Sequence, residues 1–254
     1  MSRSPFYSSL ACAPLDIHAD LHDNLHAEVW HAHTLAMPVA QVLATGVEEL
    51  DAQLPGGGWP VGALTELLQA PNHHCEWRLL TPALVHCGTA AVVLVAPPHI
   101  PMCPALAAQG VVSQRLVCVH SEAAAQRLWA AEQALRCAGV DAVLAWLPQA
   151  RADQLRRLQM AASEYNRLLF VMRPNTARQE SSPAVLRLAI EPGGSGPKWH
   201  GDMLHVHVFK RRGPPMAHAL ALAAPHAELA QLLAAAHYPS QVFESHHALD
   251  RAAA

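Results

Sequence analysis

Short runs of consecutive apolar residues alternate with stretches of helical spacing over most of the chain. The continuous runs predict buried strands at residues 63–68, 90–96, 115–120, 141–147, 168–172, 185–190 and 203–209. Stretches rich in Ala and Leu predict helices at residues 76–87, 103–109, 122–137 and 151–166. Ser121 is the predicted N-cap of the third of these helices. Strands and helices in alternation are typical of an α/β fold with a mostly parallel central sheet flanked by helices.

The same pattern divides the chain into three parts. An N-terminal extension or cap covers residues 1–41, where the periodicity is weak, and the α/β core covers residues 42–213. A Pro-Pro pair follows the core, and proline interrupts both helices and central strands. Residues 214–254 are expected to form a helical C-terminal tail, with one or two Ala/Leu helices between residues 219 and 236.

Composition and charge exclude several classes of function. Hydrophobic residues make up 52% of the 254 residues and charged residues 15%, and the formal net charge is −3. This balance lacks the electrostatic signature of a dedicated nucleic-acid binder. No apolar run reaches membrane-spanning length, and residues 1–20 lack the apolar segment of a signal peptide. We therefore expect a cytoplasmic protein that does not contact a membrane.

The 18 histidines invite a metal-binding interpretation. The groups closest to metal-ligand spacing are His31 with His33, residues 73–75 (His-His-Cys), and His205 with His207. None of these groups has a second pair of Cys or His ligands at the spacing of a zinc site. Apolar and polar positions alternate around His205 and His207, which predicts that both lie on the polar face of a strand. We therefore expect no metal site.

A Gly-rich turn lies in the most informative stretch, residues 45–84. The turn has the sequence PGGG at residues 55–58, after a short predicted helix and before the first core strand. Thr-Gly at 45–46 and Leu-Asp at 50–51 precede it, and Pro-x-Gly at 60–62 follows it. This order resembles the opening of the nucleotide-binding core of RecA-type recombinases. The resemblance implies a RecA-like fold and a phosphate loop directly after the first strand.

That phosphate loop is missing. A phosphate loop needs glycines that let backbone N–H groups point at the phosphates, a Lys for their charge and a Ser or Thr for Mg²⁺. Here Gln69 and His74 replace the two glycines. Cys75 stands where the Lys would be, and Glu76 stands where the Thr would be. The Glu76 carboxylate can satisfy the N-terminus of the next helix and would repel a phosphate, so we expect no bound nucleotide and no cofactor.

The other catalytic positions that the resemblance implies have also changed. The Glu that orients the attacking water, just after the second strand, corresponds to Pro97 and Pro98. The Mg²⁺-linked Asp at the end of the fourth strand corresponds to Trp146, and the polar residue that couples nucleotide to DNA corresponds to Arg173. Pro97, Pro98 and Trp146 are expected as turn and core residues. Together these changes predict a protein without catalytic residues.

Three further features narrow the resemblance to one family. They are the run from Leu50 to Leu67, a Val-Trp pair at residues 29–30 and a Lys-Arg-Arg-Gly end to the last core strand. The chain resembles the ImuA family, SOS-induced proteins of translesion DNA synthesis that are related to RecA and to the division inhibitor SulA. The resemblance implies an accessory subunit without turnover. Its partners would be the ImuB-type Y-family polymerase homologue and the DnaE2-type error-prone polymerase, with RecA as a further candidate.

Two sets of residues are candidate contacts with partners or nucleic acid. The basic set is Lys210, Arg211 and Arg212, to which Arg173 and Arg178 add charge; for all five, solvated surface and phosphate contact both stay open. The apolar set is Leu229, Leu232 and Leu233 of the predicted tail. Two rival functions also stay open: a divergent ATPase or recombinase-like repair protein with a site near His73 and His74, and a SulA-like inhibitor of cell division.

Overall fold

The computed structural model describes residues 41–71, 73–193, 203–214 and 216–223. The predicted N-terminal extension, apart from Gln41, lies outside the described residues, and so does the predicted tail beyond Ala223. Within the described ranges, no helix is long and apolar enough to cross a membrane.

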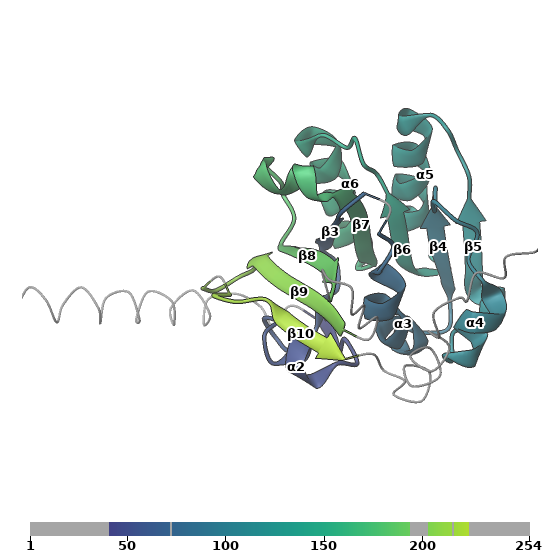
Figure 1. Ribbon diagram of the computed structural model, residues 1–254. Coiled ribbons are helices and arrows are strands. Elements are labelled where there is room, and N and C mark those ends of the chain that lie inside the picture. The colour runs from purple at the N-terminus through teal and green to yellow at the C-terminus, as the bar shows by residue number, and fades with distance from the viewer. Residues whose placement is uncertain (1–40, 72, 194–202, 215, 224–254) are drawn as a thin grey trace, which may run out of the picture. The chain divides into compact units, whose positions relative to one another are not determined.

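An eight-stranded sheet forms the centre of the described fold (Figure 1). Its order is β10-β9-β8-β3-β7-β6-β4-β5, with parallel pairing from β8 to β5 and antiparallel pairing of β9 and β10. The strands are β3 (Leu64–Gln69), β4 (Ala91–Val95), β5 (Leu116–Val119), β6 (Val140–Trp146), β7 (Leu168–Pro174), β8 (Leu186–Pro192), β9 (Met203–Lys210) and β10 (Leu220–Ala223). The predicted α/β class with a mostly parallel central sheet is confirmed.

Helices cover both faces of this sheet, as predicted. Successive strand residues point to opposite faces, so each central strand contributes to two separate apolar cores. One core contains residues of α3 (Glu76–His86) and α4 (Cys103–Ala108), and the other contains residues of α5 (Ala124–Arg136) and α6 (Ala152–Tyr165). The first strand, β3, lies between β7 and β8, so its carboxyl end is surrounded by loops from other strands.

The Gly-rich turn has a structural role of its own. It joins α2 (Glu48–Asp51) to β2 (Trp59–Pro60), which pairs with β1 (Val42–Leu43) in a separate two-stranded sheet. Gly56 and Gly57 both have φ of 79°, a left-handed conformation that glycine adopts without strain. A side chain on Gly58 would collide with the backbone of Leu43. The turn thereby holds Trp59, which is fully buried and packs edge-on against a phenylalanine of β7.

Two predictions of local structure are wrong. Residues 220–223, expected in a helix, form β10, because Leu220 and Leu222 alternate with exposed alanines and pair with β9. The sheet therefore continues past the expected boundary at residue 213. Ser121 is not the N-cap of α5; that position is Ala123, and the Ser121 hydroxyl donates to Gln126 instead.

Candidate functional site

Loops from five parallel strands meet at one edge of the sheet and form a cleft. The carboxyl ends of neighbouring parallel strands lie at the same edge, and adjacent loops that leave toward opposite faces create a crevice there. The cleft has a volume of about 590 Å³ and follows the ends of β3, β4, β5, β6 and β7. The sequence-predicted positions that line it are Gln69, His74, Pro97, Trp146 and Arg173. Residues far apart in the sequence are thus brought to one place.

Glu76 fills the predicted phosphate-loop position with its own carboxylate. Its side chain is 1% exposed, and Oε2 accepts a hydrogen bond of 2.8 Å from Nε2 of Gln69. The other carboxylate oxygen, Oε1, accepts a bond of 3.1 Å from the indole Nε1 of Trp146. Both donors are themselves buried. Each carboxylate oxygen therefore has a neutral donor, as a buried anion requires.

One backbone N–H beside Glu76 is bonded within the chain, but no side-chain hydrogen bond caps the N-terminus of α3. Glu76 is the first residue of α3, and its negative charge lies at the positive end of the helix dipole. The amide N–H of Cys75 donates to Oε1 of Gln69 at 3.0 Å. An N–H that would face a phosphate in a phosphate loop is therefore already used. At the position where the resemblance places a phosphate loop, the side chains of Gln69 and Glu76 are bonded to each other and to the adjacent Cys75 N–H and Trp146 indole.

Cys75 stands where the resemblance places the phosphate-binding Lys, but it brings no charge. Burial raises the pKa of the Cys75 thiol above its ordinary value, while Arg78 acts in the opposite direction. A thiol with a raised pKa stays protonated at neutral pH, and the thiolate is the reactive form. Cys75 is therefore unsuited to nucleophilic chemistry and to neutralising a phosphate.

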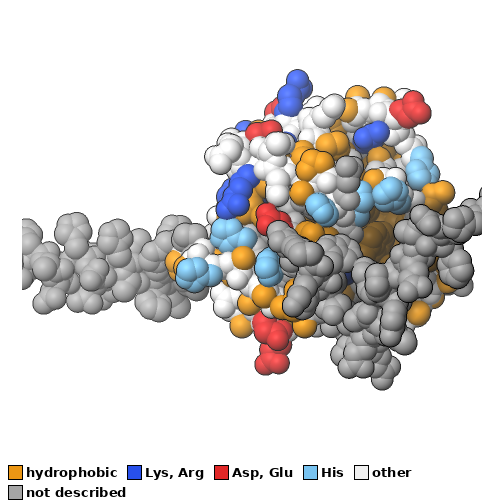
Figure 2. Space-filling model, in the orientation of Figure 1, with side chains coloured by type: hydrophobic (Ala, Val, Ile, Leu, Met, Phe, Trp, Pro, Cys, Tyr) orange, Lys and Arg blue, Asp and Glu red, His pale blue; other side chains and the backbone are white. Residues whose placement is uncertain are grey.

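Histidines border the cleft next to this cluster. The rings of His74 and His99 pack edge to face with centroids 4.8 Å apart, and Nδ1 of His74 lies 3.9 Å from Oε1 of Glu76. His73 and His120 also line the cleft. Figure 2 shows histidine side chains on the surface of this view, at its right and at its left. In the described part of the chain, no three His, Cys, Asp or Glu residues are placed to hold a metal ion.

The loop after β4 is shaped by an unusual backbone conformation. Ala96 lines the cleft with φ of 52°, a left-handed value that residues other than glycine seldom adopt. Its N–H donates to the carbonyl oxygen of Val119 at 2.8 Å, which ties this loop to the end of β5. The turn directs Pro97 and Pro98 into the wall of the cleft. The side chain of proline has no group that could orient a water molecule.

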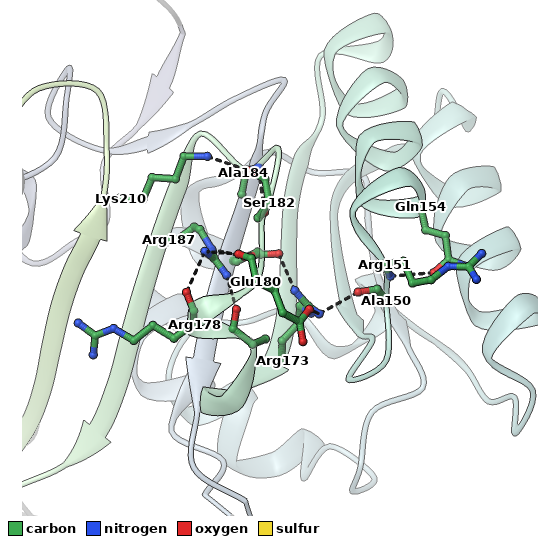
Figure 3. Close-up of polar contacts among 12 residues, drawn as sticks. Ala150, Arg151, Gln154, Arg173, Arg178, Glu180, Ser182, Ala184, Arg187 and Lys210 are labelled. Atoms are coloured by element: carbon green, nitrogen blue, oxygen red, sulfur yellow. Dashed lines mark hydrogen bonds and ion pairs between the residues drawn. The ribbon is translucent and has the colours of Figure 1, made fainter.

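A second buried carboxylate, Glu66 in the middle of β3, was not singled out by the sequence. It is 0% exposed and lies between two arginines of the neighbouring strands. Nε of Arg187 in β8 is 2.5 Å from Oε2, and a terminal nitrogen of Arg173 in β7 is 3.4 Å from Oε1. Nη2 of Arg173 also donates to the carboxylate of Glu180 at 2.6 Å and to the carbonyl oxygen of Ala150 at 2.8 Å (Figure 3).

The Glu66 network changes the interpretation of Arg173. The residue was a candidate for phosphate contact or solvated surface. Solvated surface is wrong, since Arg173 is buried and hydrogen-bonded inside the protein, while phosphate contact stays a prediction. Arg187 donates further bonds to the carbonyl oxygens of Ala177 and Glu180, in the segment around the 3₁₀ helix η2 (Asn175–Gln179). A charged residue within an apolar strand run, as in LTELL and LRLAI, is the sequence signal that could have found this network.

The basic residues at the end of β9 are largely engaged with the chain itself. Lys210 donates to the carbonyl oxygen of Ser182 at 2.8 Å. Desolvation lowers the pKa of Lys210, and the charge of Arg187 lowers it further, against an opposing effect of Glu66. Arg211 donates to carbonyl oxygens of Gln53 and Pro214, whereas Arg212 is exposed.

Three other groups of candidate residues have different outcomes. Arg178 contacts His207 and lies over the ring of Phe209. His205 is exposed, as expected for the polar face of a strand, while His207 is half-buried. The apolar candidates Leu229, Leu232 and Leu233, with His31 and His33, lie outside the described residues.

Comparisons with known proteins give no match: no family model matches the chain, and no curated protein does. Function is therefore inferred from the cleft and the networks beside it.

Proposed function

We propose that the protein is a non-catalytic adaptor with a RecA-like core, a member of the ImuA family. It acts in an SOS-induced complex for translesion DNA synthesis. Its partners are the ImuB-type Y-family polymerase homologue and the DnaE2-type error-prone polymerase, with RecA as a further candidate. In this proposal the core binds by surface contact and performs no turnover.

The observation that carries the proposal is the filled phosphate-loop position. Glu76 is the first residue of α3 and accepts bonds from Gln69 and Trp146, so a phosphate there would meet a buried negative charge. The positions that the resemblance assigns to the nucleotide site also line one cleft, which supports the comparison with RecA-type cores. A protein with this fold that has lost the nucleotide site can still act through its surfaces, by binding other proteins.

Calorimetry with ATP and Mg²⁺ tests whether the protein binds a nucleotide, which turnover would require. We expect no binding by the full chain at sub-millimolar concentrations. A RecA-type recombinase with an intact phosphate loop, titrated under the same conditions, is the positive control. Sub-millimolar binding with phosphate-dependent heat would contradict the adaptor proposal and favour a divergent ATPase.

Partner binding is tested by co-purification with the ImuB-type homologue. The sheet includes β10, so the informative truncation removes residues 224–254 and keeps Leu222, which is buried in the core. We expect loss of co-purification with an unchanged unfolding midpoint, and the same from Leu229→Glu combined with Leu232→Glu and Leu233→Glu. Unchanged capture would contradict a role for these leucines. Filamentous cells on over-expression without DNA damage would instead indicate a SulA-like inhibitor.

A further inference from the structure

The cleft at the carboxyl edge of the sheet has a wall that suits an apolar ligand. Five of its lining residues are prolines, namely Pro71, Pro97, Pro98, Pro148 and Pro174. Proline offers an apolar ring and no backbone N–H, so this wall supplies packing surface with few hydrogen-bond donors. A volume of about 590 Å³ is within the range of small-ligand sites and is large enough for several side chains.

One arginine in the lining has N–H groups available to a ligand. Arg127 of α5 is half-buried, and its Nε donates to the carbonyl oxygen of Ser121 at 2.7 Å. Across the described ranges, no acceptor contacts its two terminal nitrogens. Arg173 also lines the cleft, but its unpartnered Nε is buried and out of reach of a ligand. Guanidinium N–H groups that are open to a cleft can bind an anionic oxygen, with carboxylate and phosphate as the two matching chemistries.

The structure favours a carboxylate over a phosphate. The buried charge of Glu76 lies on the β3 side of the cleft, and phosphate carries more negative charge than a carboxylate. Glu122, another lining residue, adds a second negative charge at the exposed rim. A single carboxylate held by Arg127 matches this limited positive charge better than a triphosphate does.

The rim of the cleft adds a second anchor. His99, which packs on His74 at the cleft, is followed by Ile100 with 83% exposure, and Met102 is 72% exposed. Exposed apolar residues next to a cleft often mark a contact with another protein. A ligand that uses both features carries a carboxylate and a large apolar side chain a few residues apart, and an extended peptide has this form.

We propose that the cleft recognises an extended segment of a partner protein that contains an Asp or Glu and a large apolar residue. The carboxylate binds the terminal nitrogens of Arg127, and the apolar side chain packs against the proline wall and Ile100. The inference rests on the proposed adaptor function, since a protein that acts by contact needs a partner-binding surface. In this proposal the cleft binds a peptide segment and does not bind a nucleotide.

The test uses the full chain and an array of 12-residue peptides with an acidic pair, a Leu-Phe pair, both pairs or neither. We expect binding of the peptides that carry both pairs, and weaker binding as NaCl is raised. Arg127→Gln should weaken it by about tenfold or more, and Arg127→Lys should weaken it less, because Lys keeps the charge without the bidentate geometry. Arg136→Gln, on the exposed end of the same helix, is the matched control and should leave binding unchanged.

Ile100→Ser is a second variant, and the high exposure of Ile100 makes an effect on folding small. It should weaken the doubly anchored peptides and leave the acidic-only peptides unaffected. Binding that is equal in the parent chain and Arg127→Gln would overturn the proposal, as would no binding anywhere on the array. Competition by inorganic phosphate or ATP but not by acetate would assign the cleft to phosphate and also overturn it. Because no polymerase is present, this result is separate from co-purification with the ImuB-type homologue.

Discussion

Two buried carboxylates on the same segment of chain are stabilised in opposite ways. Glu66, in the middle of β3, lies between the charged side chains of Arg173 and Arg187. Glu76, at the start of α3, accepts hydrogen bonds from the neutral donors of Gln69 and Trp146 and lies at the positive end of a helix, with His74 at 3.9 Å. The Glu66 network ties strands together inside the sheet, whereas Glu76 takes the place that a ligand anion would occupy. One buried carboxylate is therefore balanced by opposite charges and the other by neutral donors and a helix end.

The largest expected effect is on the Glu66 network. Glu66→Gln removes the negative charge, which leaves Arg187 buried without a counter-ion and Arg173 with only the exposed carboxylate of Glu180. We expect a loss of about 3–5 kcal/mol in the free energy of unfolding, measured by urea denaturation. Glu180→Gln is the control, because the side chain of Glu180 is 56% exposed and its ion pair with Arg173 is solvated. That variant should lose less than about 1 kcal/mol. Equal losses in the two variants would show that Glu66 is not the centre of the network.

A smaller loss is expected at Glu76. Glu76→Ala leaves the buried donors of Gln69 and Trp146 without acceptors, and we expect about 2–3 kcal/mol of destabilisation by the same measurement. Trp146→Phe keeps the ring and removes one of the two bonds, so it should lose about half as much. If Trp146→Phe were as stable as the parent chain, the hydrogen bond to Glu76 would have no role in stability.

The smallest expected effect is stabilisation by phosphate, which should differ between variants of the two carboxylates. With the Glu76 side chain removed, the N-terminus of α3 is free to attract an anion. Phosphate should then stabilise Glu76→Ala by about 1 kcal/mol at a concentration about five times its Kd, seen as a higher melting temperature. The parent chain and Glu66→Gln should show no such response. A phosphate response in the parent chain would contradict the view that Glu76 excludes anions.

The sequence predicted the sheet and the loss of the phosphate loop because both depend on local patterns. Continuous apolar runs identify buried strands, and a Glu in place of the magnesium-binding Thr is visible without a structure. The role of Trp146 was not predictable, since its donor geometry depends on how β6 lies beside the loop after β3. Arg173 was misjudged for the same reason: its partner Glu66 is on another strand. The LALA sequence of β10 fits a helix as well as a strand, and only pairing with β9 decides between them.

The carboxylate of Glu76 is a permanent part of the chain, whereas a nucleotide comes and goes. Its bonds to the Gln69 amide and the Trp146 indole join the end of β3 to the end of β6 at any ligand concentration. This edge of the sheet is therefore preorganised by the chain itself.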